Sequence, residues 1–296
     1  MNFTRIINLA TAIAVALLFA APATQGAVIQ HYWDMDMLSG GVPTDVVGGV
    51  PTAAEVGDPL LLNATYGAPY AGAGNALQTN LSGTGSAHLL ADVHDGGGTA
   101  AANATAMNFG SGDFSISYWS YDDAAGDADG RGPRVFDSLD GTTTGIQLGS
   151  NLAGVFNYRM DDDAGNAVIS NTTGAPFDAL LQADDVWTHV SINVSRSTDS
   201  AEVFFNGATQ GTYDISALTG SIFPTQDMEI GVINGGSAVG AAQAAGLDDL
   251  AIYSGLLSQA DITGLARGTI TPDQIPEPGS IVLLGLGGLA LFLRRR

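Results

Sequence analysis

The side chains in this sequence that could do chemistry are mainly aspartates. The chain has 30 acidic residues against nine basic ones, and only four of the acids are glutamate: Glu55, Glu202, Glu229 and Glu277. Aspartate is short, favours turns and is a good ligand for hard cations. The four histidines contain no close ligand pair, and the sequence has neither a Gly-x-Ser-x-Gly elbow nor a cysteine nucleophile. These residue types favour a cation site or a solvated surface, and they argue against an enzyme.

The overall charge and composition narrow the class of protein further. The formal net charge is −21, and the chain has no lysine. Such a body repels nucleic acid, because phosphate binding needs clustered Lys and Arg. The hydrophobic content of 45% argues against wholesale disorder, and 40 glycines suit many short strands joined by tight turns. Without cysteine the chain cannot form disulfides, so its stability must come from core burial, with a bound metal as a possible addition.

The elements that must position these residues are predicted to be strands. Residues 114–120 and 187–194 show near period-two alternation, so each segment should bury one face. Asn206-Gly207 marks a tight turn into a strand near 209–213, and Ser258-x-x-Asp261 resembles the capping box of one short helix over 258–266. Many antiparallel strands without helical crossovers predict an all-β, two-sheet antiparallel sandwich. The ten strand candidates are 28–33, 76–80, 113–121, 134–139, 145–148, 153–159, 186–195, 201–205, 228–233 and 247–253.

Four sequence blocks, in order, carry a resemblance to a known family. They are Asp113-Phe-Ser-Ile-Ser-Tyr-Trp119, Trp187-Thr-His-Val190, Glu202-Val-Phe-Phe-Asn-Gly207 and Gly246-Leu-Asp-Asp-Leu-Ala-Ile-Tyr253. Together they resemble the concanavalin A-like, laminin-G-type jelly roll, over roughly residues 28–268. Glucanases of that fold carry Glu-x-Asp-x-Glu on one strand, and neither Glu202 nor Glu229 has such a partner. The resemblance therefore implies a non-catalytic jelly-roll module.

The same resemblance implies a calcium site near the rim of a sheet. The matching residues here are Asp36, Asp45 and Asp248. Strand alternation predicts that Asp248 is semi-buried and that Asp249 points outward. A semi-buried carboxylate needs a partner, and a hard cation would supply one. The alternative is that Asp248 accepts hydrogen bonds from backbone N–H groups of a loop.

Three other polar features are expected to be structural. His189 alternates with Val190, so we expect it to face away from the core without a catalytic role. The acidic loops 122–130 and 161–166 do not have the ligand series of an EF-hand, and we expect them to be solvated turns.

The two ends of the chain look like export and sorting signals. Residues 1–27 have one arginine, an apolar run and small residues, which is typical of a secretory signal peptide. Pro276-Glu277-Pro278, an apolar segment over 280–293 and a terminal triple arginine resemble the PEP-CTERM tail over 276–296, joined by a linker at 269–275. That resemblance implies processing by an exosortase-like membrane transpeptidase. The apolar segment is short for a permanent span. An ordinary short membrane anchor is the alternative.

The sequence thus predicts an exported protein that pauses in the inner membrane through its C-terminal helix and then reaches the outer surface or extracellular matrix. Its jelly roll is expected to bind extracellular polysaccharide or a surface protein, without nucleic acid as a partner and with Ca²⁺ as the one candidate cofactor. Two alternatives stay open: a glycan-degrading enzyme of concanavalin A-like fold, and a purely structural matrix component.

Overall fold

Strands dominate the part of the chain that the structure describes. The structure is a computed structural model, and it describes residues 26–39, 42–49, 52–54, 61–63, 66–79, 89–91, 107–122, 134–139, 144–150, 155–169, 180–224, 228–231 and 245–276. One group of strands comprises β1 (Val28–Ser39), β2 (Val42–Asp45), β4 (Leu61–Asn63), β5 (Ala76–Thr79), β7 (Phe114–Asp122), β12 (Trp187–Ser195), β13 (Ser200–Phe205), β14 (Ala208–Asp214) and β16 (Ala245–Ser254). The other comprises β3 (Thr52–Ala54), β6 (Leu89–Ala91), β8 (Arg134–Asp137), β9 (Gly145–Ser150), β10 (Phe156–Asp161), β11 (Ala167–Ile169) and β15 (Met228–Ile230).

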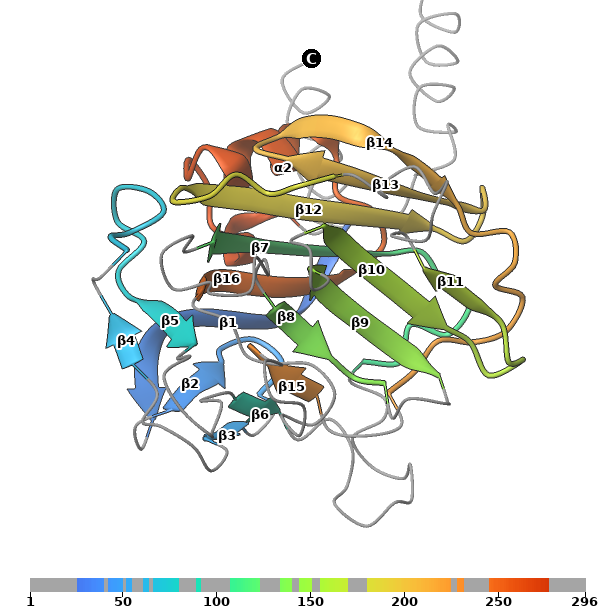
Figure 1. Ribbon diagram of the computed structural model, residues 1–296, viewed down its shortest axis with the longest axis horizontal. Helices are drawn as coiled ribbons and strands as arrows, with labels where there is room; N and C mark the ends of the chain where they lie inside the picture. The colour runs from blue at the N-terminus through green and yellow to red at the C-terminus, as the bar shows by residue number, and fades with distance from the viewer. Residues whose placement is uncertain are drawn as a thin grey trace, which may run out of the picture.

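Within these residues the two groups form two antiparallel sheets. The nine-stranded sheet has the order β14-β13-β12-β7-β16-β1-β2, with β5 paired to β16 and β4 paired to β5. The seven-stranded sheet has the order β11-β10-β9-β8-β15-β6-β3 and lies in front of the first in Figure 1. All ten expected strand segments overlap observed strands. The prediction of an all-β sandwich of two antiparallel sheets is confirmed.

The main hydrophobic core lies between the two sheets. Alternate residues of β7 enter it, among them Phe114, Ile116 and Tyr118, and each is at most 2% exposed. The opposite face of β7 is also covered, because Ser115 and Ser117 are buried as well. Burial on both faces explains why this strand shows weaker polar alternation than a strand with one solvated face.

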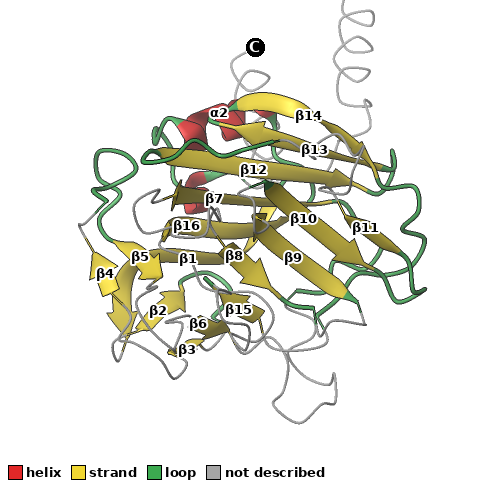
Figure 2. Ribbon diagram, viewed as in Figure 1, coloured by secondary structure: helices red, strands yellow, loops and turns green. Residues whose placement is uncertain are grey.

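A second, smaller hydrophobic cluster covers the outer face of the nine-stranded sheet. The helix α2 (Gln259–Ala266) begins at Ser258, whose side chain and that of Asp261 form the predicted capping box. Ile262 and Leu265 of this helix pack with strand residues such as Tyr253. Figure 2 shows how little helix the fold contains beside its strands. The expected linker 269–275 also packs here, since it holds the 3₁₀ turn η2 (Pro272–Gln274) and the buried Ile275.

The terminal signals fall almost entirely outside the described residues. Pro276 is the last described residue, so Glu277, Pro278 and the apolar segment 280–293 lie beyond it, as do residues 1–25. Among the described residues, no helix is both long enough and apolar enough to cross a membrane. The signal peptide and the C-terminal membrane segment stay predictions.

Candidate functional site

Asp45, one of the three expected calcium ligands, already has hydrogen-bond partners for both of its carboxylate oxygens. Its Oδ1 accepts hydrogen bonds from the backbone N–H groups of Tyr32 (2.9 Å), Val47 (3.1 Å) and Gly48 (2.9 Å). Its Oδ2 lies 2.6 Å from Nδ1 of His31. Burial alone would raise the pKa of Asp45, but the hydrogen bonds from His31, Tyr32 and Gly48 lower it below its ordinary value. Asp45 therefore fixes the turn after β2, and its contacts there need no metal.

Asp248 and Asp249 lie together at a bulge in β16. The pairing of β16 with β7 shifts register between Asp248 and Ala251, and Asp249 has a positive φ of 49°. Both aspartates are buried, with exposures of 0% and 6%. The expectation that Asp249 faces solvent is wrong, because Tyr32 of the outer hydrophobic cluster and Tyr70 cover its carboxylate. The carboxylate of Asp249 instead accepts a 2.5 Å hydrogen bond from the hydroxyl of Tyr32 and another from that of Tyr70.

Burial shapes the electrostatics of these two aspartates. It raises the pKa of Asp249 to about 6, even though the two tyrosine hydroxyls act in the opposite direction. Burial and the neighbouring charge of Asp249 raise the pKa of Asp248 well above its ordinary value. Asp248 Oδ1 accepts a hydrogen bond from the Asp249 N–H (2.8 Å), whereas its buried Oδ2 has no hydrogen-bond partner in the described part of the chain.

Asp36 lies close enough to add to this negative charge. Its carboxylate raises the pKa of both Asp248 and Asp249, and its Oδ1 accepts a 2.5 Å hydrogen bond from the N–H of Asn75. Gly74 presses so closely on it that any Cβ at that position would overlap the Asp36 carboxylate. We call Asp36, Asp248 and Asp249, with Tyr32 and Tyr70, the acidic cluster.

The structure thus brings together only two of the three expected calcium ligands. Asp36 and Asp248 share the acidic cluster, while Asp45 belongs to the separate turn after β2. Over the described residues, no three histidine or acidic side chains converge closely enough to hold a metal ion. The orphaned Oδ2 of Asp248 is the feature that fits a cation. Calcium at Asp36 and Asp248 stays a prediction.

The other features expected to be structural are more buried than predicted. His189 is 2% exposed beside the ring of Trp119, and burial lowers its pKa to about 3, so it is neutral. In the 161–166 loop, Asp162 is also buried and accepts hydrogen bonds from Asn166 and from the N–H of Gly220. The prediction of a solvated turn is therefore wrong at Asp162, whose carboxylate joins the 161–166 loop to the segment around Gly220.

A polar row that the sequence did not reveal crosses the outer face of the seven-stranded sheet. In β9 and β10 the core-facing residues alternate with polar ones, as in Ile146, Gln147 and Leu148. The register places Glu229 opposite Asp137, Asp137 opposite Gln147, and Gln147 opposite Arg159. Six side chains from four strands therefore lie on one face of this sheet. The polar row consists of Asp137, Gln147, Asn157, Arg159, Asp161 and Glu229.

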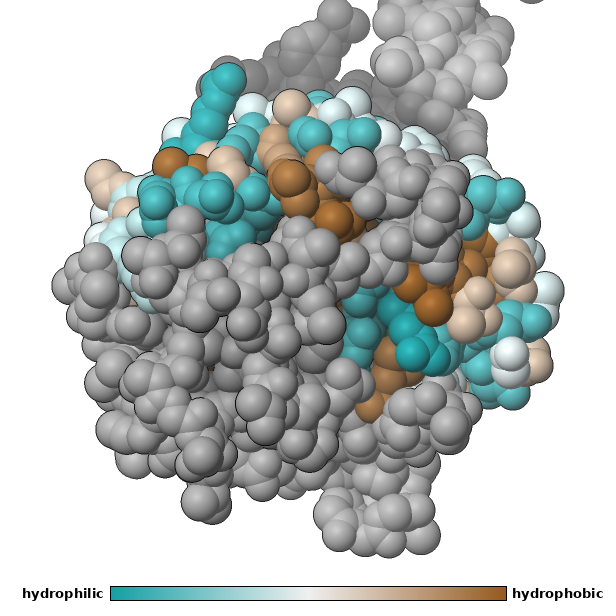
Figure 3. Space-filling model, in the orientation of Figure 1, coloured by the Kyte–Doolittle hydropathy of each residue, from teal (hydrophilic) through white to brown (hydrophobic). Residues whose placement is uncertain are grey.

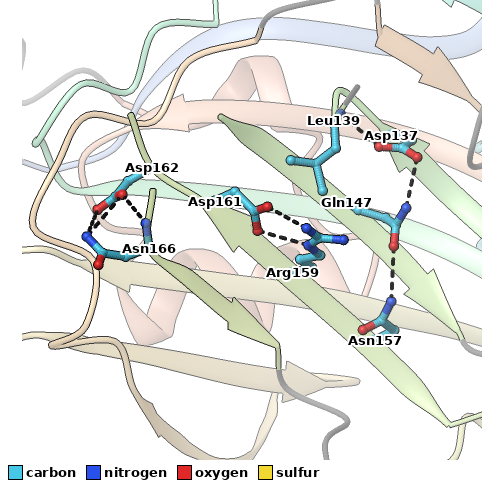
Figure 4. Close-up of polar contacts among 8 residues, drawn as sticks. All are labelled: Asp137, Leu139, Gln147, Asn157, Arg159, Asp161, Asp162 and Asn166. Atoms are coloured by element: carbon cyan, nitrogen blue, oxygen red, sulfur yellow. Dashed lines mark hydrogen bonds and ion pairs between the residues drawn. The ribbon is translucent and has the colours of Figure 1, made fainter. Parts of the chain in front are cut away.

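Hydrogen bonds link most of the polar row (Figure 4). Asp137 Oδ1 accepts from the Leu139 N–H (2.8 Å), and Asp137 Oδ2 accepts from Gln147 Nε2 (2.8 Å). Asn157 Nδ2 in turn donates to Gln147 Oε1 at 3.4 Å. The guanidinium of Arg159 donates two hydrogen bonds to Asp161, at 2.9 and 2.5 Å, so the charge of this arginine is neutralised locally.

One buried atom of the polar row has no hydrogen-bond partner in the part of the chain that the structure describes. Asn157 is 8% exposed, and its Oδ1 has no hydrogen-bond partner among the described residues. Figure 3, in the orientation of Figure 1, shows hydrophilic residues set back in a hollow on this face of the molecule. A buried acceptor without a donor is costly, so a ligand donor would be favoured there.

The sequence could have revealed only part of this row. The alternation Phe156-Asn-Tyr-Arg-Met-Asp161 is a legible strand signal with three polar residues on one face. No such alternation within a single strand could reveal that Asp137 and Glu229 belong to the row, because their proximity depends on β8 and β15 being neighbours. No local spacing encodes that pairing.

Several solved structures that this chain resembles are binding domains of toxins. The chain aligns with the binding domain of Paraclostridial Mosquitocidal Protein 1 at 16% identity and a TM-score of 0.58, covering 83% of this chain and 53% of that one. It aligns with the ligand-binding domain of botulinum neurotoxin serotype D, solved in complex with N-acetylneuraminic acid, at 16% identity and a TM-score of 0.53, covering 81% and 52%. The chain thus spans about half the length of these structures, and at such identity the likeness shows the fold alone.

Comparison with protein-family models shows which family this chain matches. A search of curated proteins found no match. Residues 274–296 match the PEP-CTERM protein-sorting motif, which implies export to the surface or the extracellular space. Residues 95–263, more than half of the chain, match the concanavalin A-like lectin/glucanases superfamily. With the two-sheet sandwich described above, this match shows that the chain belongs to the concanavalin A-like lectin/glucanases superfamily.

Proposed function

We propose that this protein is an exported, non-catalytic binding module that holds neutral carbohydrate against the polar row. The observation that carries the proposal is the unpartnered Oδ1 of Asn157, in the described part of the chain, beside the linked amides and carboxylates of the row. Sugar hydroxyls both donate and accept hydrogen bonds, so they suit a surface rich in amides and carboxylates. A net charge of −21 and the paired Arg159 disfavour acidic glycans. The toxin domain solved with N-acetylneuraminic acid supports carbohydrate binding by this fold, although that sugar is acidic and the neutral class proposed here rests on the charges of this chain alone.

The proposal is tested by glycan binding with the purified full chain. We expect binding to a neutral polysaccharide on a glycan array, confirmed by titration calorimetry. Gln147→Leu should weaken that binding about tenfold, because one to two hydrogen bonds of the row are lost. Gln210→Leu makes the same change at an exposed position of β14 and should have no effect. No binding to any glycan would leave a protein ligand or a structural matrix role instead.

A glycoside hydrolase is the second candidate, and one observation favours it. Glu229 lies directly opposite Asp137 in the antiparallel pairing of β15 with β8. Side chains directly opposite one another on a sheet face are neighbours, so the carboxyl groups of this pair can approach each other, and glycosidases act with such a pair of carboxyl groups. Against catalysis, both oxygens of Asp137 already accept hydrogen bonds from Leu139 and Gln147. Release of reducing ends that disappears in Glu229→Gln would establish the hydrolase.

We further propose that the C-terminal tail carries out the sorting. The PEP-CTERM match supports an exosortase-like transpeptidase as the partner that cuts near residues 276–278. Before that step, the apolar segment 280–293 would hold the chain in the inner membrane, with the three terminal arginines on the cytoplasmic side. After it, the jelly roll would reach the outer surface or the extracellular matrix.

Calcium at the acidic cluster is a separate proposal. Asp36 and Asp248 would hold the ion, and its charge would offset the cost of burying two neighbouring aspartates. The support is the orphaned Oδ2 of Asp248. The ion would act structurally by tying β1 to β16 next to the bulge of β16.

A further inference from the structure

We propose that a relay of three side chains, Asp137, Gln147 and Asn157, sets the hydrogen-bonding polarity of the carbohydrate site. It makes Asn157 present an acceptor, so the site takes a saccharide through a free hydroxyl that donates. This inference deepens the proposed function and rests on it.

The relay begins at Asp137, which can only accept. A carboxylate offers acceptors and no N–H donor. The backbone N–H of Leu139 occupies Asp137 Oδ1 at 2.8 Å, which leaves Oδ2 facing Gln147. Gln147 must then turn its Nε2 toward Asp137, where it donates at 2.8 Å.

The orientation of Gln147 decides that of Asn157. With Nε2 committed to Asp137, the carbonyl Oε1 of Gln147 faces β10 and needs a donor. Asn157 supplies its Nδ2, at 3.4 Å. The other end of the Asn157 amide is Oδ1, and this atom has no partner among the residues that the structure describes. A planar amide cannot reverse one end without reversing the other, so the polarity at Asn157 is inherited from Asp137.

This arrangement favours a ligand that can donate a hydrogen bond to Asn157 Oδ1. Asn157 is 8% exposed and its Oδ1 has no partner among the described residues, so a ligand hydroxyl that reaches this atom would supply the missing donor. A sugar hydroxyl donates readily, whereas a fluorine in its place cannot. A hydroxyl seated at Asn157 therefore binds, and its fluorinated counterpart binds poorly.

One isosteric substitution should reverse the relay. In Asp137→Asn, the Leu139 N–H still requires an oxygen at the Oδ1 position, so the new Nδ2 faces Gln147. Gln147 must then present Oε1 to residue 137 and Nε2 to Asn157. Asn157 responds by accepting with Oδ1 and presenting Nδ2 outward. The end of the Asn157 amide that faces the ligand site then becomes a hydrogen-bond donor, while the shape of the side chain stays the same.

The experiment compares the full-length wild type with Asp137→Asn. An immobilised panel of neutral gluco-, manno- and galacto-oligosaccharides identifies the sugar bound most tightly, and its mono-deoxyfluoro derivatives are then titrated. For one derivative the wild type should bind about tenfold more weakly than to the parent sugar, which corresponds to about 1.4 kcal/mol. In Asp137→Asn that preference should fall to about twofold or less. Asp199→Asn, the same change at an exposed turn, should keep the wild-type preference.

A second readout does not depend on the ligand. In the wild type an Asn157 side-chain N–H is hydrogen-bonded to Gln147, so its hydrogen exchange, followed by NMR, should be slow. In Asp137→Asn that amide should exchange faster. Binding without discrimination against any fluorinated sugar, or unchanged Asn157 exchange in the variant, overturns the relay while leaving carbohydrate binding intact. Absence of binding to the whole panel overturns the proposed function and with it the ligand assigned to Asn157.

Discussion

Asp249→Asn should stabilise the protein at neutral pH. The carboxylate is 6% exposed, and burial raises its pKa to about 6 from an ordinary value of 3.8. Because the folded state holds the proton more tightly than the unfolded state, this group contributes stability at low pH that is lost as the pH rises through about 6. Asparagine keeps the shape, carries no charge and tolerates the positive φ of 49° at this position.

The magnitude follows from the difference in pKa. A rise from 3.8 to about 6 is about two units, and at 1.36 kcal/mol per unit it amounts to about 3 kcal/mol. The substituted asparagine would also keep contact with both tyrosines, since its amide can accept from the hydroxyl of Tyr32 and donate to that of Tyr70. For a domain of this size, about 3 kcal/mol corresponds to about 6–12 °C in melting temperature.

The assay is thermal and urea unfolding of the full chain in chelator, at several values between about pH 4 and about pH 8. The variant and the wild type should be nearly equal at the acid end, where the wild-type carboxyl is protonated. Their difference should grow toward neutral pH. Asp199→Asn, also at a positive φ but exposed, is the matched control and should give no pH-dependent gain. A variant that is less stable than the wild type at about pH 8, or a difference independent of pH, would refute the reasoning.

Three further predictions concern other parts of the molecule. Chelator should lower the melting temperature of protein prepared with calcium, because an ion bound only to the folded state stabilises it, and Asp248→Asn should abolish this response; an unchanged melting curve removes the calcium proposal. Asp162→Ala should cost about 2–4 kcal/mol in urea unfolding, since the N–H donors of Asn166 and Gly220 lose their buried acceptor; a loss below about 0.5 kcal/mol would contradict this role of Asp162. Replacing residues 276–278 by alanine should leave uncleaved protein in the membrane fraction of cells with an exosortase, and mass spectrometry of a correctly trimmed product would count against the sorting proposal.

Local sequence signals correctly predicted the elements whose geometry is set by residues close together in the chain. Asn206-Gly207 predicted a hairpin, and both residues have positive φ values, 50° and 83°, between β13 and β14. The capping box at Ser258 predicted the start of α2. The turn and the helix start each depend on a few residues that are adjacent in the chain, so the sequence alone is sufficient to predict them.

The candidate sites depend on information that local patterns lack. At Asp249 the strand period breaks at a bulge, and the two tyrosines that bind its carboxylate are 217 and 179 positions away in the chain. The pair formed by Asp137 and Glu229 requires β8 and β15 to be neighbours. Hydrophobic alternation can predict that a residue faces outward, but it cannot predict which residue of another strand stands beside it.

The pairing of β1 with β16 has a consequence for the order of folding. Val28 lies opposite Ser254, 226 positions later, and β16 occupies the centre of the nine-stranded sheet between β7 and β1. A chain that emerges N-terminus first therefore holds β1 and the facing edge of β7 without their shared neighbour until almost the whole domain is out. Contacts of such long range are slow to form, and an uncovered strand edge invites aggregation. A nascent chain stopped before residue 245 should thus be a client for chaperones, however complete its other strands.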